Sequence, residues 1–372
     1  MSDHEQLLRQ LIERMTASGS LRTEPWKDAA TAVPRHEFLR NGFFRAVPGS
    51  APTAWTPVLE DGDGWLTACY ADESLVTQIA GTIKPTDIRG EIMREPTSSS
   101  TLPSLVLRML EDLEVGPDMK VLEIGTGTGY STAVLCARLG SDRVTSIEYD
   151  EEVALRAREA LNRLGTFPDL LTGDGLLGDD ERAPYDRIIA TCAVRTVPAA
   201  WLEQTRPGGQ ILTTIGGWLS ASELVRLTVH EDGTASGPVL GGQVSFMLAR
   251  PQLAPQLGLL PDLSAGKERE AVIGADVLAD WTTRFVAQFA VPTAQHLKLR
   301  QRQHDEDVLV DVETGSWAAL HEEDDRWIVR QGGPELLWDA VEDHLGRWHV
   351  AGTPAVDEAT VRVTAEGQSI HW

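Results

Sequence analysis

The sequence predicts an α/β protein: a doubly wound, Rossmann-like parallel sheet with helices before it and a small α+β module after it. Three observations predict this class. An apolar strand at residues 120–124 runs into three alternating glycines, and a helical pattern follows at 131–139. Further apolar runs then alternate with helical segments, as in a parallel sheet. The 372 residues suffice for a core domain and an accessory one.

Composition divides the chain into three parts. Residues 1–95 begin with apolar residues at helical spacing and are predicted to be a helical region on the substrate side. A second helix is expected from about residue 25 to Val33, because Pro34 cannot continue a helix. Residues 96–228 hold the predicted sheet. From residue 229 prolines and six of the eleven tryptophans mark an accessory module, a candidate for peptide recognition.

The elements are expected in the following order. Strands of the central sheet should lie at 120–124, 144–150, just before Gly173, 186–191 and 210–215, the last after a turn at 207–209. Helices should lie at 102–113, 131–139 and 151–164. In the accessory module, strands at 308–312 and 316–320 flank a hairpin turn; a strand at 326–330, a helix at 334–345 and a strand at 360–365 follow. We expect the tryptophans to form the core of this module, with a peptide-binding groove as the alternative.

The glycine turn after the first strand predicts a nucleotide-sized ligand. A phosphate-binding P-loop is excluded, because no lysine lies between Lys120 and Lys267. A dinucleotide motif would need its third glycine where Tyr130 stands. The motif is instead E-x-G-x-G-x-G with Glu123 inside it, and a carboxylate there suits the cationic methionine end of S-adenosyl-L-methionine.

Two later acidic residues fit the same cofactor. Glu148 ends the second strand, where an acidic side chain takes ribose hydroxyls in this class of fold. Asp174 follows the third strand and suits the adenine amino group. Residues predicted to bind the cofactor, which would leave as S-adenosyl-L-homocysteine, are Glu123, Gly125, Thr126, Gly127, Thr128, Gly129, Tyr130, Glu148, Tyr149, Asp174 and Gly175. A glycine turn without a ligand is the structural alternative.

Whole-chain features predict a soluble, cytoplasmic enzyme. The sequence has no run of eighteen apolar residues and a polar start, so neither a membrane span nor a signal peptide is expected. A net charge of −23 argues against nucleic acid as a partner. The three cysteines lack metal-ligand spacing, as do the nine histidines, so no metal site is expected.

Residues 122–130, Glu148, 173–175 and 204–209 resemble protein-L-isoaspartate O-methyltransferases, as do the upstream segments 33–38 and 70–75. The resemblance covers about residues 5–228 and implies a class I methyltransferase sheet. It departs from the family twice. The family's Thr-Ile-Ser-x-Pro segment is replaced by residues 97–103, and the module after 229 is generally lacking in the repair enzymes. Both features resemble divergent members that accompany ribosomally made peptides such as graspetides, lanthipeptides and lasso peptides.

The resemblance implies transfer of a methyl group to a carboxylate, which needs no strong base. Hydroxyl donors would position that carboxylate, and the candidate catalytic residues are Ser99, Ser100 and Thr101, preceded by Ser98. Their structural alternative is a polar loop that caps the next helix. His36 is a weaker candidate as a base. Asp72 and Glu73 could orient the substrate loop or cap a turn.

The resulting hypothesis is a carboxyl O-methyltransferase that acts on an aspartyl side chain of a modified, cyclised ribosomal peptide. The ester would then close to an aspartimide, or be converted to isoaspartate. The first alternative is a general repair enzyme for isoaspartyl residues. The second is a scaffold that binds cofactor and peptide without turnover.

Overall fold

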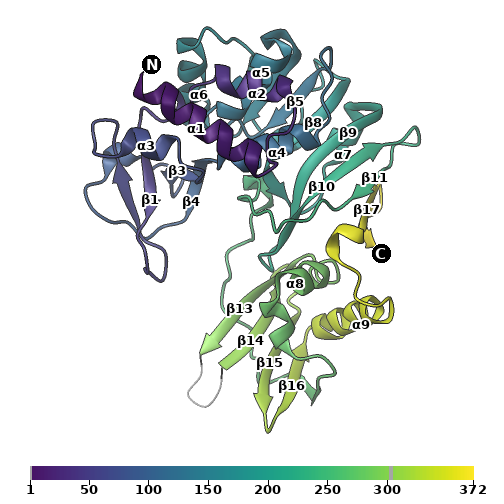
Figure 1. The fold of residues 1–372 in the computed structure, drawn as a ribbon. Helices are drawn as coiled ribbons and strands as arrows, with labels where there is room; N and C mark the ends of the chain where they lie inside the picture. Colours follow the sequence, from purple (N-terminus) through teal and green to yellow (C-terminus); the bar gives the residue numbers. More distant parts are fainter. Residues whose placement is uncertain (1, 301–304) are drawn as a thin grey trace. The chain divides into compact units, whose positions relative to one another are not determined.

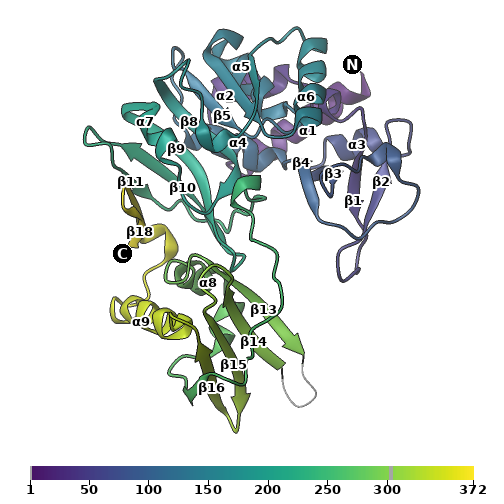
Figure 2. The same ribbon diagram turned by 180° about the vertical axis from the view of Figure 1, so that it is seen from behind.

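The computed structural model describes residues 2–300 and 305–372, and Figures 1 and 2 show it from two sides. The chain forms two compact units. The core unit holds the residues up to Thr191 together with Glu203–Leu212, and the C-terminal unit holds Cys192–Leu202 and Thr213–Trp372. Residues on both sides of position 95 therefore belong to one compact unit.

The core unit contains the predicted parallel sheet. Strand β5 (Val121–Ile124) pairs in parallel with β6 (Val144–Glu148) and with β8 (Tyr185–Val194), and β6 pairs in parallel with β7 (Asp169–Thr172). The order within this unit is β9-β8-β5-β6-β7. All of β5 is buried, as is usual for a central strand of such a sheet. The doubly wound α/β class is confirmed.

Helices of the core unit follow the predicted positions. They are α4 (Pro103–Asp112), α5 (Tyr130–Leu139) and α6 (Glu151–Arg163) (Figure 1). Both α5 and α6 contact β6. Asp150 caps α6, since its carboxylate accepts from the backbone N–H groups of Glu152 at 3.0 Å and Val153 at 3.1 Å. No helix in the described parts of the chain is long and apolar enough to cross a bilayer.

The N-terminal region is only partly helical, which corrects the prediction. Helices α1 (Asp3–Ala17) and α2 (Glu24–Ala32) are present, and α3 (Trp65–Cys69) is short. A sheet of order β2-β1-β3-β4 accompanies them, built from β1 (Phe43–Ala46), β2 (Trp55–Val58), β3 (Leu75–Ile79) and β4 (Pro96–Ser100). Its strands have four or five residues each. Runs this short carry too little periodicity to be recognised in a sequence.

Strand β9 (Thr205–Gly216) is longer than predicted. The expected turn at 207–209 lies inside it. Gly208 has a φ of 75°, which glycine adopts at little cost, so the strand passes through this irregularity instead of beginning after it.

The C-terminal unit contains the predicted α+β elements. One group of strands has the order β18-β17-β11-β10, and a separate five-stranded sheet has the order β12-β16-β15-β14-β13. The strands are β10 (Ser222–Val229), β11 (Ala235–Pro238), β12 (Lys267–Glu270), β13 (Ala294–Arg300), β14 (Asp305–Asp311), β15 (Trp317–Glu323), β16 (Arg326–Gly332), β17 (Thr360–Thr364) and β18 (Gly367–His371). The helices are α8 (Trp281–Ala287) and α9 (Leu337–Val350), while the short α7 (Ala199–Glu203) lies at the unit boundary.

Helix α9 does not stop before Gly346 as predicted but continues to Val350. Leu345 and Trp348 are both buried on its inner face, and their burial continues the apolar face past the glycine. Trp317 and Trp338 are buried as well, while Trp281, Trp327 and Trp372 are half-buried. The tryptophans therefore contribute to the core of this unit, as expected.

Candidate active site

The loop between β5 and α5 has a backbone that glycine makes possible. Gly125, Gly127 and Gly129 have φ values of 93°, 55° and 89°, in the left-handed region that other residues enter at a cost. A β-carbon on Gly125 would lie 2.9 Å from Thr191 Oγ1. The Thr191 hydroxyl donates to the Gly125 carbonyl at 2.5 Å, which fixes the first turn of the loop. The three glycines therefore turn with φ above zero, as the motif predicted, and the ligand of the loop stays a prediction.

Glu123 lies beneath this loop and is fully buried. Its carboxylate accepts hydrogen bonds from the hydroxyls of Ser131 at 2.5 Å, Thr132 at 2.5 Å and Ser146 at 2.7 Å. Burial raises the pKa of Glu123, and these three donors oppose that rise. Thr126 belongs to the same buried network, because its hydroxyl lies 2.6 Å from that of Ser146. Glu123 and Thr126 therefore support the loop from its buried side. Any effect of either residue on the cofactor would act through the position of the loop.

Glu148 and Asp174 lie at the carboxyl ends of neighbouring strands. Glu148 Oε2 accepts from the Gly127 backbone N–H at 2.8 Å, and its Oε1 accepts from that of Asp150 at 3.0 Å. Asp174 Oδ1 accepts from the Leu176 backbone N–H at 2.9 Å. Because β5, β6 and β7 are adjacent and parallel, their ends meet at one edge of the sheet, where such folds bind their ligands.

The remaining predicted cofactor residues differ in exposure. Tyr149 is 49% exposed beside Glu148, whereas Tyr130 is buried and packs edge-on against Phe38 with ring centroids 6.0 Å apart. Burial raises the pKa of Tyr130 to about 12. Gly175 is tightly enclosed, since a β-carbon there would lie 2.5 Å from Ile124 Cγ2. Tyr130 therefore supports the loop, and Tyr149 remains accessible.

The hydroxyl segment forms strand β4 rather than a loop, which corrects the capping alternative. Helix α4 is capped from elsewhere in the chain: the Asp72 carboxylate accepts from the Ser104 backbone N–H at 2.9 Å, and the Ser74 hydroxyl accepts from that of Leu102 at 3.0 Å. The Glu73 carboxylate pairs with Arg45 at 3.0 Å. Asp72 is thus a cap, one of the two roles expected for it.

Strand alternation separates the three candidate catalytic residues. Ser98 and Ser100 are buried on one face of β4, and the Ser98 hydroxyl accepts from that of Thr77 at 3.2 Å. Ser99 and Thr101 are half-buried. The Ser99 carbonyl oxygen lies 3.4 Å from the position of a β-carbon on Gly127, so β4 adjoins the glycine loop. Ser99 therefore lies at the loop predicted to bind the cofactor, and Thr101 follows where β4 ends.

Arg35 is the residue that sequence reasoning missed. Its side chain is fully buried and donates to the carbonyls of Cys69, Ala71, Glu73, Ser100 and Thr101 at 2.9–3.2 Å, and to the Ser100 hydroxyl at 3.4 Å. It therefore joins the 69–73 segment to the end of β4. The available signal was a charged residue inside the otherwise largely apolar start of the motif at 33–38.

His36 has other partners. Its Nδ1 lies 2.6 Å from the Tyr70 hydroxyl and its Nε2 lies 3.5 Å from Glu37. Burial lowers the pKa of His36. These contacts account for the imidazole structurally and give no support to a catalytic base.

Comparisons with known proteins agree with this geometry. The family model described as protein-L-isoaspartate(D-aspartate) O-methyltransferase matches residues 75–246. The protein-L-isoaspartate O-methyltransferase of Pyrococcus horikoshii is 35% identical over 251 residues, which are 66% of this chain and 96% of that one. The enzyme of the same name from Geobacter metallireducens is 41% identical over 133 residues, which are 36% of this chain and 60% of the relative.

A solved structure named protein-L-isoaspartate O-methyltransferase shares the fold over nearly the whole chain. It covers 98% of this chain and 99% of its own, with a TM-score of 0.55 and 22% identity. The similarity of fold therefore extends to the module after residue 229. The chain belongs to the protein-L-isoaspartate O-methyltransferase family and is an S-adenosylmethionine-dependent carboxyl O-methyltransferase.

Proposed function

We propose that the enzyme methylates the free carboxylate of isoaspartyl residues in proteins or peptides. The names of the relatives support this substrate over the aspartyl side chain of a cyclised ribosomal peptide, for which the comparisons give no support. The observation that carries the proposal is the contact of Ser99 with the glycine loop. That contact puts a hydroxyl-bearing strand beside the loop that would hold the methyl donor.

The residues present fit S-adenosylmethionine. Without side chains, Gly125 and Gly127 would let the methionine end approach the main chain of the loop. Glu148 suits the ribose hydroxyls, and Asp174 suits the adenine amino group. When bound, the cofactor supplies an electrophilic methyl group, which leaves its sulfonium sulfur as the carboxylate oxygen forms the new O–CH₃ bond. Glu123 would keep the loop in shape from below.

The residues of this chain would contribute to methyl transfer mainly by positioning the substrate carboxylate. A carboxylate is already nucleophilic at neutral pH, so it must be held in line and kept from water. The hydroxyls of Ser99 and Thr101 would orient it, since neutral donors quench an attacking oxygen less than an ion pair does. Arg35 would fix the end of this segment by donating to the backbone carbonyls of Ser100 and Thr101 from the buried side.

The ester would break down without further catalysis. The backbone nitrogen of the next residue attacks the ester carbon, methanol leaves, and a five-membered imide closes. Hydrolysis of the imide would return part of the material to a normal aspartyl linkage, which is the chemistry of repair.

A second candidate function is methylation of a constrained aspartyl peptide in the same active site. One sequence feature favours it: residues 99–101 stand where the family usually has Thr-Ile-Ser. The test uses three peptides: two linear ones of identical sequence, one isoaspartyl and one aspartyl, and a cyclised aspartyl peptide. We expect methylation of the isoaspartyl peptide alone. Methylation only of a cyclised aspartyl peptide would contradict the repair proposal and favour the second candidate.

A further inference from the structure

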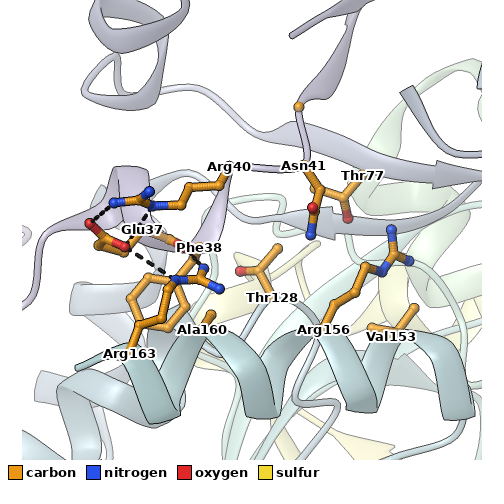
Figure 3. A pocket seen from close by; sticks show the side chains of 12 residues that line it. Glu37, Phe38, Arg40, Asn41, Thr77, Thr128, Val153, Arg156, Ala160 and Arg163 are labelled. Carbon is orange, nitrogen blue, oxygen red and sulfur yellow. Dashed lines mark hydrogen bonds and ion pairs between the residues drawn. The ribbon is translucent and has the colours of Figure 1, made fainter. Parts of the chain in front are cut away.

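A pocket in the core unit lies beside the glycine loop and is separate from the hydroxyl segment itself. Its walls come from residues 37, 38 and 40–42, from Thr77 of β3, from Gly127 and Thr128 of the loop, and from one face of α6 (Figure 3). The charged residues that line it are Glu37, Arg40, Arg156 and Arg163. Three cations and one anion surround this space, in a chain whose net charge is −23.

Glu37, the one acidic residue among the described residues that line this pocket, is already paired with two arginines. Glu37 accepts from Arg40 through both carboxylate oxygens, at 2.7 and 2.8 Å, and from Arg163 Nε at 3.4 Å. The Arg40 guanidinium holds the pKa of Glu37 below its ordinary value, so this carboxylate is ionised and already paired. Glu37 is therefore not a partner for the third arginine.

Arg156 is that third arginine. In the described part of the chain no carboxylate lies within ion-pair distance of its guanidinium, which is half-buried. Its neighbour one helical turn earlier, Glu152, instead pairs with Lys84 at 2.6 Å. Such an i, i+4 pair would otherwise be the ordinary partner for a helix arginine.

Neutral donors face the same space. Figure 3 shows the Asn41 amide directed into the space beside Arg156, and the Thr128 hydroxyl in the same space on the side of Arg163. The Thr77 hydroxyl also lies there, although it donates to Ser98. A guanidinium with amide and hydroxyl donors is the donor set that binds a carboxylate, because a planar cation meets two oxygens at once.

We propose that this pocket, centred on Arg156, binds a second carboxylate of the substrate: an acidic side chain near the residue that is methylated. The proposal rests on the proposed function. The pocket adjoins the hydroxyl segment at two points, since Thr77 bonds to Ser98 and the Gly127 that lines it meets Ser99. The methylated carboxylate itself is a poor occupant, because an ion pair would weaken its attack.

The experiment compares isoaspartyl peptides that differ by one Glu→Gln change, with the Glu moved along the positions on each side of the isoaspartyl residue. Binding is measured by titration calorimetry and turnover by methyl incorporation, in wild type and Arg156→Gln. At one position we expect wild type to bind the Glu peptide about tenfold more tightly. Arg156→Gln should abolish this preference, Arg156→Lys should keep part of it, and the KM for S-adenosylmethionine should not change.

Arg158→Gln is the matched control. It removes the same charge from α6, but Arg158 is exposed and its guanidinium donates to the Leu170 carbonyl. No preference for Glu at any position in wild type would overturn the proposal. A second outcome would also overturn it: Arg156→Gln raises the KM for S-adenosylmethionine but keeps the preference for the Glu peptide. That outcome would assign the pocket to the cofactor's own carboxylate. A binding preference without methylation of any peptide would instead contradict the proposed function alone.

Discussion

The carbonyl oxygen of Ser99 lies 3.4 Å from the point where a β-carbon on Gly127 would stand. The strand that carries the candidate acceptor-binding hydroxyls therefore adjoins the loop predicted to bind the cofactor, and a side chain at Gly127 would meet the strand's backbone. This contact explains how two segments about thirty residues apart, each weak evidence alone, form one site.

Replacing Gly127 by alanine tests that fit. Its φ of 55° would cost a side chain about 1–2 kcal/mol, and the new β-carbon would press on Ser99. We expect cofactor affinity, measured by calorimetry, to fall about tenfold or more. Gly81→Ala is the control, because Gly81 has a φ of 77° and no atom within 4 Å of an added β-carbon. Equal cofactor affinity in the two variants would contradict the fit.

The two half-buried hydroxyls should matter for turnover. Ser99→Ala and Thr101→Val are expected to lower kcat about 10- to 100-fold, because each removes a donor that positions the carboxylate. Cofactor affinity should be unchanged. Ser98→Ala serves as the control, since its hydroxyl is buried against Thr77. If all three variants retained the wild-type kcat, the hydroxyl segment would have no catalytic role.

Removing the buried guanidinium should destabilise the core unit. Arg35→Met removes the donor to the buried bonds with the Cys69 and Ser100 carbonyls and to the part-buried bonds with Ala71 and Glu73. We expect a loss of about 3–5 kcal/mol in the free energy of unfolding. Arg45→Met is the control: it breaks the exposed pair with Glu73 and should cost about 0–1 kcal/mol. Thermal unfolding followed by calorimetry distinguishes them, and similar melting temperatures would refute a central role for Arg35.

The depressed pKa of His36 predicts a pH dependence. Burial favours its neutral form, so below the ordinary pKa of 6.5 the unfolded chain binds more protons than the folded one. Stability should therefore fall as pH drops from about 6.5 toward the lower pKa of the folded protein. His36→Gln should weaken that fall while leaving turnover unchanged. His344, whose pKa burial also lowers, remains in both proteins, so the difference between them reports His36.

Much of the fold could be predicted because its signals are local. The strand, glycine turn and helix at 121–139 are contiguous, and their periodicity and backbone demands lie in one window of sequence. The N-terminal sheet could not be predicted in the same way, since its strands are short and their pairing joins residues far apart. Pairing of Phe44 with Val76 illustrates this.

The candidate site likewise has features that the sequence could predict and features that it could not. The positions of Glu148 and Asp174 followed from strand ends, whereas the roles of Arg35 and Arg156 depend on partners that only tertiary structure reveals. Glu123 was only partly predictable. Its motif position was informative, but its burial under three hydroxyls was not visible in the sequence.

The most direct test of the account is the identity of the methylated atom. The enzyme would be incubated with an isoaspartyl peptide and S-adenosylmethionine carrying a labelled methyl group, and the product examined by tandem mass spectrometry before and after mild alkali. We expect a label on the isoaspartyl carboxyl that alkali releases as methanol, while the imide formed in that step hydrolyses to a mixture of aspartyl and isoaspartyl peptide. A label that survives alkali on a hydroxyl or amine would contradict it.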